Sequence, residues 1–204
     1  MKIIKGLFTS LALALINQVS GQQADKTETD WQSSIVLLDV TRNNHNFRIP
    51  WDKRAQSVSK FGVVIKDKEL ITTASGLANH TLIRIQKGGR GKWTNGKVLW
   101  IDYQANLAVL GVENDDFWKD LKPVKFAESK KLKKNLQVIR WRGGNIEKRA
   151  AEFSRFTVAD ANFNQAPRIE LKASSEIEGA GQAELMVSGD KVVGLVASKI
   201  SGTC

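Results

Sequence analysis

The sequence predicts an all-β fold, either a sandwich or a pair of barrels, from three observations. Short apolar runs rich in Val, Ile, Trp, Phe and Thr recur along the chain, and strands prefer these residue types. Turn signals separate the runs at roughly ten-residue intervals, which is typical of sandwiches and barrels. Helical periodicity is brief, and neither a heptad pattern nor an internal repeat is present.

The strands are assigned in chain order from these runs. SSIVLLDV (33–40) is the first, and FGVVIKDKELITTA (61–74) is expected to form a hairpin that turns at 66–68. The polar stretch 43–60 is expected to be a loop that interrupts the sheet. Further strands are expected within 80–103, 106–113, 121–129, 135–144, 148–160, 168–174 and 190–198, and short helical turns at 75–79 and 114–121.

The first 21 residues have the features of a secretory signal peptide. A basic start, MKIIK, precedes an apolar run and then small residues suited to cleavage near Gly21. The run is too short for a comfortable membrane span, which needs roughly 20 apolar residues. Residues 22–30 are polar and are expected to be a flexible leader. The interpretation is a secreted or periplasmic protein of a bacterial envelope, whose fold rests on its core because Cys204 is the single cysteine.

The chain is basic, with a formal net charge of +10 over 204 residues. Ten lysines and arginines fall within 122–149, against Glu128 and Glu147. Such a surface can bind nucleic acid, anionic membranes or acidic glycans, although a solvated strand face explains the same charges. The residues that would form an anionic-surface site are Lys130, Lys131, Lys133 and Lys134.

The motif scan predicts no metal site and no cofactor. The chain has two histidines and one cysteine, and no cluster has the spacing of a zinc site. GGRGKW (88–93) and EGAGQA (178–183) are rich in glycine, but neither opens a long helix after a strand. Both therefore lack the context of a phosphate or dinucleotide loop, and turns are the simpler reading.

Several segments, taken in order, resemble the trypsin-like domain of the HtrA/Deg family of secreted serine proteases. The segments are FGVVIKDKELITTASGLANHTLIRIQ (61–86), KVLWIDYQANLAVLGVE (97–113), LKPVKFAESKKLKKNLQVIRWRGG (121–144) and RIELKASSEIEGAGQAELMVSGDKVVGLVAS (168–198). The resemblance implies a chymotrypsin-type fold of two six-stranded antiparallel β-barrels within a single domain at 31–204. The barrels would span about 31–117 and 122–200, with a cleft between them. Members of the family commonly carry a PDZ module, but we expect none here, because only a few residues follow the last expected strand.

The same resemblance places Ser75, Asn106 and Gly181 at the positions of the family's catalytic His, Asp and Ser. A serine protease needs a hydroxyl nucleophile, an imidazole that takes its proton, and a carboxylate that holds the imidazole. Serine is no general base near neutral pH, an amide carries no charge, and glycine has no nucleophile. The sequence therefore predicts a trypsin-fold protein without the triad.

Neighbouring side chains offer a relocated triad or a surviving anion loop. His80 lies five residues beyond the first position, and Asp102 lies four residues before the second. The available hydroxyls near the third position belong to Ser174, Ser175 and Ser188. The small residues Gly179, Ala180 and Gly181 keep the composition of a loop whose backbone N–H groups bind an oxyanion, although glycines also serve a plain tight turn.

Three functional hypotheses follow from these residues. The first is a secreted pseudoprotease that binds an extended peptide or an envelope protein in the inter-barrel cleft. The second is an active trypsin-like serine peptidase with a rearranged site. The third is a binder of anionic surfaces through the basic patch. The resemblance leaves a homo-oligomer open, because members of the family commonly trimerise.

Overall fold

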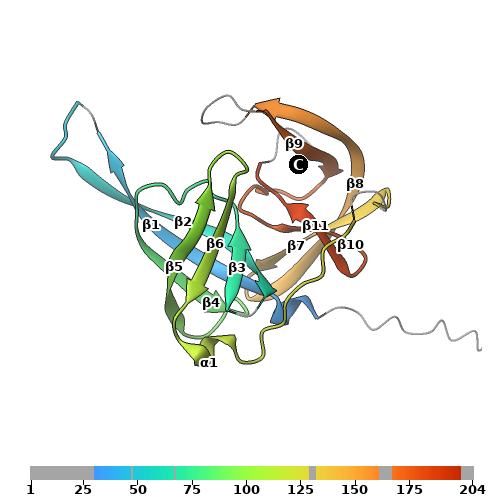
Figure 1. The fold of residues 1–204 in the computed structure, drawn as a ribbon, viewed down its shortest axis with the longest axis horizontal. Helices are drawn as coiled ribbons and strands as arrows, with labels where there is room; N and C mark the ends of the chain where they lie inside the picture. The colour runs from blue at the N-terminus through green and yellow to red at the C-terminus, as the bar shows by residue number, and fades with distance from the viewer. Residues whose placement is uncertain (1–29, 47, 67, 129–131, 161–166, 199–204) are drawn as a thin grey trace, which may run out of the picture.

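The computed structural model describes residues 30–46, 48–66, 68–128, 132–160 and 167–198. The predicted signal peptide, most of the leader and Cys204 lie outside these ranges. The described chain consists almost wholly of antiparallel strands arranged in two sheets (Figure 1). Its helices are a 3-10 turn at Trp31–Ser33 and α1 at Asp115–Trp118, and neither approaches the length or the hydrophobicity of a membrane span.

The first sheet closes into a six-stranded barrel in the order β1-β2-β3-β6-β5-β4. Closure removes the free sheet edges, so backbone groups around the barrel find partners on both sides. The strands are β1 (Ile35–His45), β2 (Lys53–Lys66), β3 (Glu69–Thr72), β4 (His80–Lys87), β5 (Trp93–Asp102) and β6 (Leu107–Val112).

Strand β1 serves two cores through its two faces. Val36, Leu38 and Val40 are fully buried inside the first barrel. Ile35 is also fully buried, but it belongs to a second cluster that packs against the other sheet. Because side chains alternate across a strand, one apolar run fills the barrel and also faces its neighbour.

The prediction of a loop at 43–60 is wrong for most of that segment. Strands β1 and β2 stay paired from Ile35↔Val63 out to His45↔Lys53, and the outer part forms an arm that leaves the barrel (Figure 1). Backbone hydrogen bonds hold this ribbon, and neither face is covered by a core. Apolar and polar residues therefore do not alternate along this segment, and the sequence lacks the pattern that predicts a strand.

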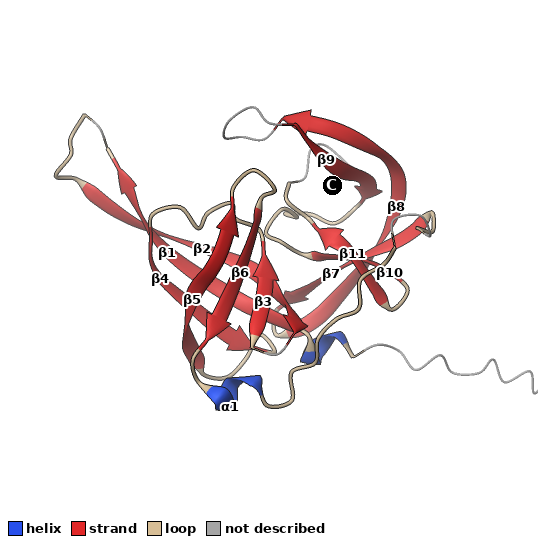
Figure 2. Ribbon diagram, in the orientation of Figure 1, coloured by secondary structure: helices blue, strands red, loops and turns tan. Residues whose placement is uncertain are grey.

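The second sheet has the order β11-β10-β7-β8-β9 and curls beside the barrel (Figure 2). Its strands are β7 (Asn135–Arg142), β8 (Asn145–Asp160), β9 (Pro167–Ser175), β10 (Leu185–Ser188) and β11 (Lys191–Leu195). The strand expected within 121–129 contributes one parallel bridge, Phe126↔Val192, instead of a full strand. The expected turn at 114–121 contains α1, and 75–79 forms non-helical turns.

A shared apolar cluster joins the two sheets. Trp141 of β7 packs with Ile35, Phe61 and Val63 of the first barrel, and its indole Nε1–H donates to the carbonyl of Ile35 at 3.2 Å. The connecting segment is fixed as well, since the backbone N–H of Val124 donates to the carbonyl of Val64 at 2.9 Å. The relative position of the two sheets is therefore set by a packed interior.

We expect Trp141→Ala to lower the free energy of unfolding by about 3–5 kcal/mol, because it removes a buried indole and a hydrogen bond between the sheets. Trp51→Ala is the matched control, since Trp51 is 82% exposed on the arm, and it should change stability by no more than about 0.5 kcal/mol. Urea unfolding followed by circular dichroism measures both. Equal losses in the two variants would contradict the joining role of Trp141.

Candidate functional site

The structure brings the three predicted triad positions to the junction of the two sheets. Ser75 follows β3, Asn106 precedes β6, and Gly181 lies in the loop before β10. Ser75 and Gly181 line one cavity of about 220 Å³, and Asn106 lines a neighbouring cavity of about 330 Å³. The positions taken from separate sequence segments are thus neighbours in space.

The side chain of Asn106 makes a direct contact with the segment that carries Ser75. Its Oδ1 accepts the backbone N–H of Ser75 at 2.8 Å, and its own carbonyl accepts the N–H of Ala74 at 3.1 Å. Asn106 adopts a φ of 56°, a left-handed conformation that asparagine tolerates better than most residues. The amide therefore holds the turn in shape, and its neutral oxygen has no charge with which to stabilise an imidazolium.

Lys60 of β2 is a site residue that the sequence analysis missed. Its side chain is only 1% exposed, and Nζ donates to the carbonyls of Thr73, at 2.5 Å, and Ser75. Burial lowers the pKa of this ammonium from 10.5 to about 7. A signal for it existed, since Lys60 alternates with the buried residues Gly62 and Val64 on one strand face.

The cavity beside Lys60 has a cationic lining. It is bounded by Arg42, Val58, Lys60, Thr73, Ser75, Gly76, Gly181 and Gln182. The Nη2 of Arg42 lies 3.4 Å from Oε1 of Gln56, and within the described chain its buried Nε has no hydrogen-bond partner. Two cationic residues and two hydroxyl residues, Thr73 and Ser75, line this space, and these lining residues include neither an imidazole nor a carboxylate.

The glycine-rich loop has its own carboxylate. The N–H groups of Gly181 and Gln182 both donate to Oε2 of Glu184 at 2.8 Å, and Glu184 is only 1% exposed. The carbonyl of Gln182 accepts the N–H of Phe61 at 2.8 Å, so the loop is also tied to β2. The oxyanion-type role of 179–181 stays a prediction, and the N–H of Gly181 already has an acceptor.

Backbone geometry explains why small residues occupy this loop. Gly179 has a φ of 62° and Gly181 a φ of 118°, conformations in which a side chain is strained. Arg140 also holds the loop, because its Nη1 donates to the carbonyl of Glu178 at 2.7 Å. The nucleophile position is therefore held in a conformation that suits glycine.

The side chains considered for a relocated triad make other contacts. Nδ1 of His80 lies 2.8 Å from the carbonyl of Leu77. Ser175 is buried and its hydroxyl donates to the carbonyl of Ala150 at 3.2 Å, while Asp102 accepts the N–H groups of its own turn. The other two hydroxyls lie on β9 and at the end of β10, as Ser174 and Ser188. These contacts do not join an imidazole to a hydroxyl.

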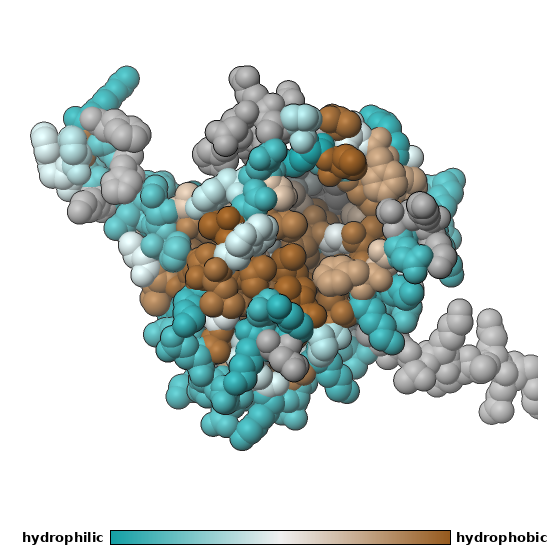
Figure 3. Space-filling view, viewed as in Figure 1, coloured by the Kyte–Doolittle hydropathy of each residue, from teal (hydrophilic) through white to brown (hydrophobic). Residues whose placement is uncertain are grey.

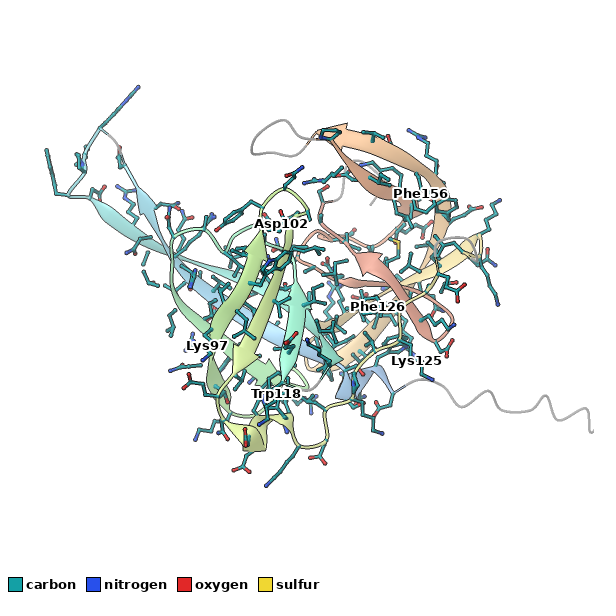
Figure 4. The ribbon with its side chains drawn as sticks, viewed as in Figure 1. Lys97, Asp102, Trp118, Lys125, Phe126 and Phe156 are labelled. Carbon is teal, nitrogen blue, oxygen red and sulfur yellow. The ribbon has the colours of Figure 1, made fainter. Side chains whose placement is uncertain are left out.

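The larger cavity lies between the sheets and is mainly apolar. Figure 3 shows apolar surface gathered on this face of the molecule, between the strands of the two sheets. Figure 4 labels Phe156 on β8 and Asp102 at the end of β5. The lining comes from both sheets and includes Thr73, Asn106, Leu107, Phe156, Ile169, Met186, Leu195 and Val196. Its position corresponds to the predicted inter-barrel cleft.

The predicted basic patch is described only in part. Lys130 and Lys131 lie outside the described residues, whereas Lys133 and Lys134 are exposed. Nζ of Lys134 lies 2.6 Å from a carboxylate oxygen of Glu152, and its hydrogen bond with Glu152 raises the pKa of Lys134. An exposed pair of this kind contributes little to stability. Binding of anionic surfaces by this patch remains a prediction.

No protein-family model matches the chain, but individual proteins do. Putative protease Do-like 13 of Arabidopsis thaliana is 28% identical over 166 residues, which cover 80% of this chain and 34% of that protein. Protease Do-like 4, mitochondrial, of the same plant is 23% identical over 170 residues, covering 82% of this chain and 33% of that protein. The chain thus spans about a third of the length of these relatives.

Solved structures of proteases share the fold. The active form of the Rv3671c protease from M. tuberculosis superposes with a TM-score of 0.65 at 17% identity, covering 84% of this chain and 74% of that one. A variant of the HtrA-type protease AlgW with a decapeptide gives 0.64 at 16% identity, covering 83% and 57%. The predicted trypsin-like fold and the resemblance to the HtrA/Deg family are confirmed.

The lowered pKa of Lys60 predicts a specific dependence of stability on pH. Between pH 7 and 10.5 the unfolded chain holds a proton that the folded chain has released, so stability rises with pH through this window. The slope reaches about 1.4 kcal/mol per pH unit at most. Lys60→Met lacks this dependence, so its unfolding free energy relative to wild type should fall between pH 7 and 9.

Thermal or urea unfolding at several pH values measures this difference. Lys133→Met is the control, because it replaces an exposed lysine with the same side chain. The curve of that control should run parallel to wild type. A constant gap between Lys60→Met and wild type across the window would show that Lys60 does not titrate there.

Proposed function

We propose that this chain is a trypsin-fold pseudoprotease, a protein that binds a peptide or protein segment and does not hydrolyse it. One observation carries the proposal. Gly181 occupies the nucleophile position, has no side chain, and donates its N–H to Glu184. The fold of HtrA-type proteases supports a role that uses the same cleft. The chain would keep the architecture of a protease and lack its chemistry.

The other two positions support the same proposal. In the part of the chain that the structure describes, Ser75 has no imidazole partner, and Asn106 binds a backbone N–H with a neutral oxygen. Acyl transfer needs a nucleophile, a base and stabilisation of the oxyanion together, and loss of triad members costs about 10⁴ to 10⁶ in rate. With all three positions changed, little hydrolysis is expected.

The alternative is a serine peptidase with a rearranged site, and Lys60 is the observation that favours it. A lysine whose pKa is about 7 is suited to act as a general base near neutral pH. Its Nζ, however, donates to the backbone carbonyls of Thr73 and Ser75. A base for Ser75 would instead have to accept the proton of the serine hydroxyl.

The cleft between the sheets is the expected place for the bound segment. It is lined mainly by apolar residues, among them Ile169 of β9, which is 78% exposed. β9 also forms one edge of the described sheet, and an edge strand offers backbone groups to an added extended peptide. The segment 1–21 supports an envelope or extracellular location for this binding.

We expect the wild-type chain to leave unfolded casein intact and to resist labelling by a fluorophosphonate probe, because no contact described for the candidate serines joins one of them to a base. Gel-based labelling and release of acid-soluble peptides measure these outcomes, with Ser174→Ala, Ser175→Ala and Ser188→Ala run beside the wild type. Labelling that disappears in Ser75→Ala or Lys60→Met would establish the rearranged peptidase. Labelling lost in one of the other three serine variants would establish a relocated nucleophile.

Restoring the triad alone should not restore a protease. In the triple variant Ser75→His, Asn106→Asp and Gly181→Ser, the loop N–H would still be held by Glu184 and an ammonium would still lie beside residue 75. Adding Glu184→Leu and Lys60→Met frees the N–H and removes the charge. We expect casein hydrolysis to rise about a hundredfold over the triple variant, since one oxyanion donor is worth 10² to 10³ in rate. Equal activity of the two variants would contradict a blocking role for Glu184.

A further inference from the structure

We propose that the cavity beside Lys60 is a carboxylate-binding site, which takes the C-terminal carboxylate of a bound peptide. This inference rests on the proposed binding function and specifies one end of its site. The ligand group is the carboxylate, which a chain terminus, an acidic side chain or a small free acid can supply. The contacts below favour the chain terminus.

The first argument is unmatched positive charge. Lys60 and Arg42 both line the cavity, whose lining residues include no acid. Within the described chain, the ammonium of Lys60 has hydrogen bonds only to two backbone carbonyls and forms no ion pair, so one of its three N–H groups remains available. A buried cation without a counter-ion is costly, and an entering anion offsets that cost.

The second argument comes from Arg42, which approaches from β1. Its buried Nε lacks a partner in the described chain, and the only hydrogen bond described for its side chain joins Nη2 to Oε1 of Gln56 at 3.4 Å. Guanidinium and ammonium groups form short, strong hydrogen bonds with carboxylates. Arg42 and Lys60 stand on neighbouring strands, so the two cations can approach one ligand from different sides.

The third argument is that the N–H groups of the glycine-rich loop are not available to bind an anion. The N–H groups of Gly181 and Gln182 already donate to the buried carboxylate of Glu184. The charged residue that lines the cavity together with Lys60 is Arg42, whereas Glu184 is not among the lining residues. Recognition of an anion in the cavity falls to side chains instead of the backbone.

The shape of the site favours the end of a peptide over a free ion. Thr73 lines both the small cavity and the larger apolar cleft, so the two spaces meet at one residue. Asn106 of the cleft also contacts Ser75 of the small cavity. An extended peptide in the cleft would therefore bring its last carboxylate to Lys60 while its apolar side chains stay between the sheets.

The test uses N-acetylalanine as a probe, because it presents a peptide-like terminal carboxylate, and N-acetylalanine amide as its neutral twin. Lysine-selective ¹³C NMR on the full chain follows Lys60 during each titration. We expect the acid to shift the Lys60 signal and raise the pKa of Lys60, and the amide to do neither. Binding should weaken about tenfold from pH 6 to pH 8, since the site binds the protonated lysine, whose pKa is about 7.

Variants and a second anion complete the test. Lys60→Met and Arg42→Gln should each weaken binding of the acid at least about tenfold, whereas Arg54→Gln, which changes an exposed arginine on the arm, should leave it unchanged. Inorganic phosphate that binds more tightly than N-acetylalanine would overturn the carboxylate assignment. Equal shifts with acid and amide would also overturn it, while the absence of hydrolysis and of probe labelling would still support the pseudoprotease.

Discussion

The ammonium of Lys60 organises the centre of this molecule. Its Nζ donates hydrogen bonds to the carbonyls of Thr73 and Ser75 and so holds both next to β2. The N–H of the following residue, Phe61, donates to the carbonyl of Gln182 and so ties the glycine-rich loop to the same strand. Segments from both sheets thus meet around one buried cation. Burying a charge is expensive, so such a group persists where its surroundings supply hydrogen bonds to match it. The arrangement of the site therefore depends on the hydrogen bonds that offset the cost of burying the Lys60 ammonium.

Glu184 is a second buried ionisable residue, of opposite charge type, and it binds backbone N–H groups where Lys60 binds carbonyls. It accepts two N–H groups of the glycine-rich loop and so replaces an outside anion with an internal one. The loop gains a fixed shape without any bound molecule. Lys60 and Glu184 thus pair most of the backbone polar groups of this region within the chain. The exception is the cationic lining of the small cavity.

Much of the fold could be predicted from the sequence, because strand alternation and turn residues act locally. The positions of Ser75, Asn106 and Gly181 also followed from ordered segments, and the structure places them together. The burial of Lys60 and Glu184 was missed, although Lys60 alternates with buried residues on its strand and Glu184 directly precedes the apolar run 185–187, because charged side chains are ordinarily exposed. Their environment is set by strands distant in the sequence, such as the contact of β2 with the loop before β10.

The arm formed by the outer parts of β1 and β2 depends on the barrel for its stability. Two strands without a covered face are marginally stable by themselves, so the arm takes its order from the barrel to which it is anchored. The last pairing between β1 and β4 joins Arg42 to His80, beside an irregularity at Thr41 and Arg42. Arg42 thus stands where the arm joins the barrel and also lines the cationic cavity, so the base of the arm and one wall of that cavity share a residue.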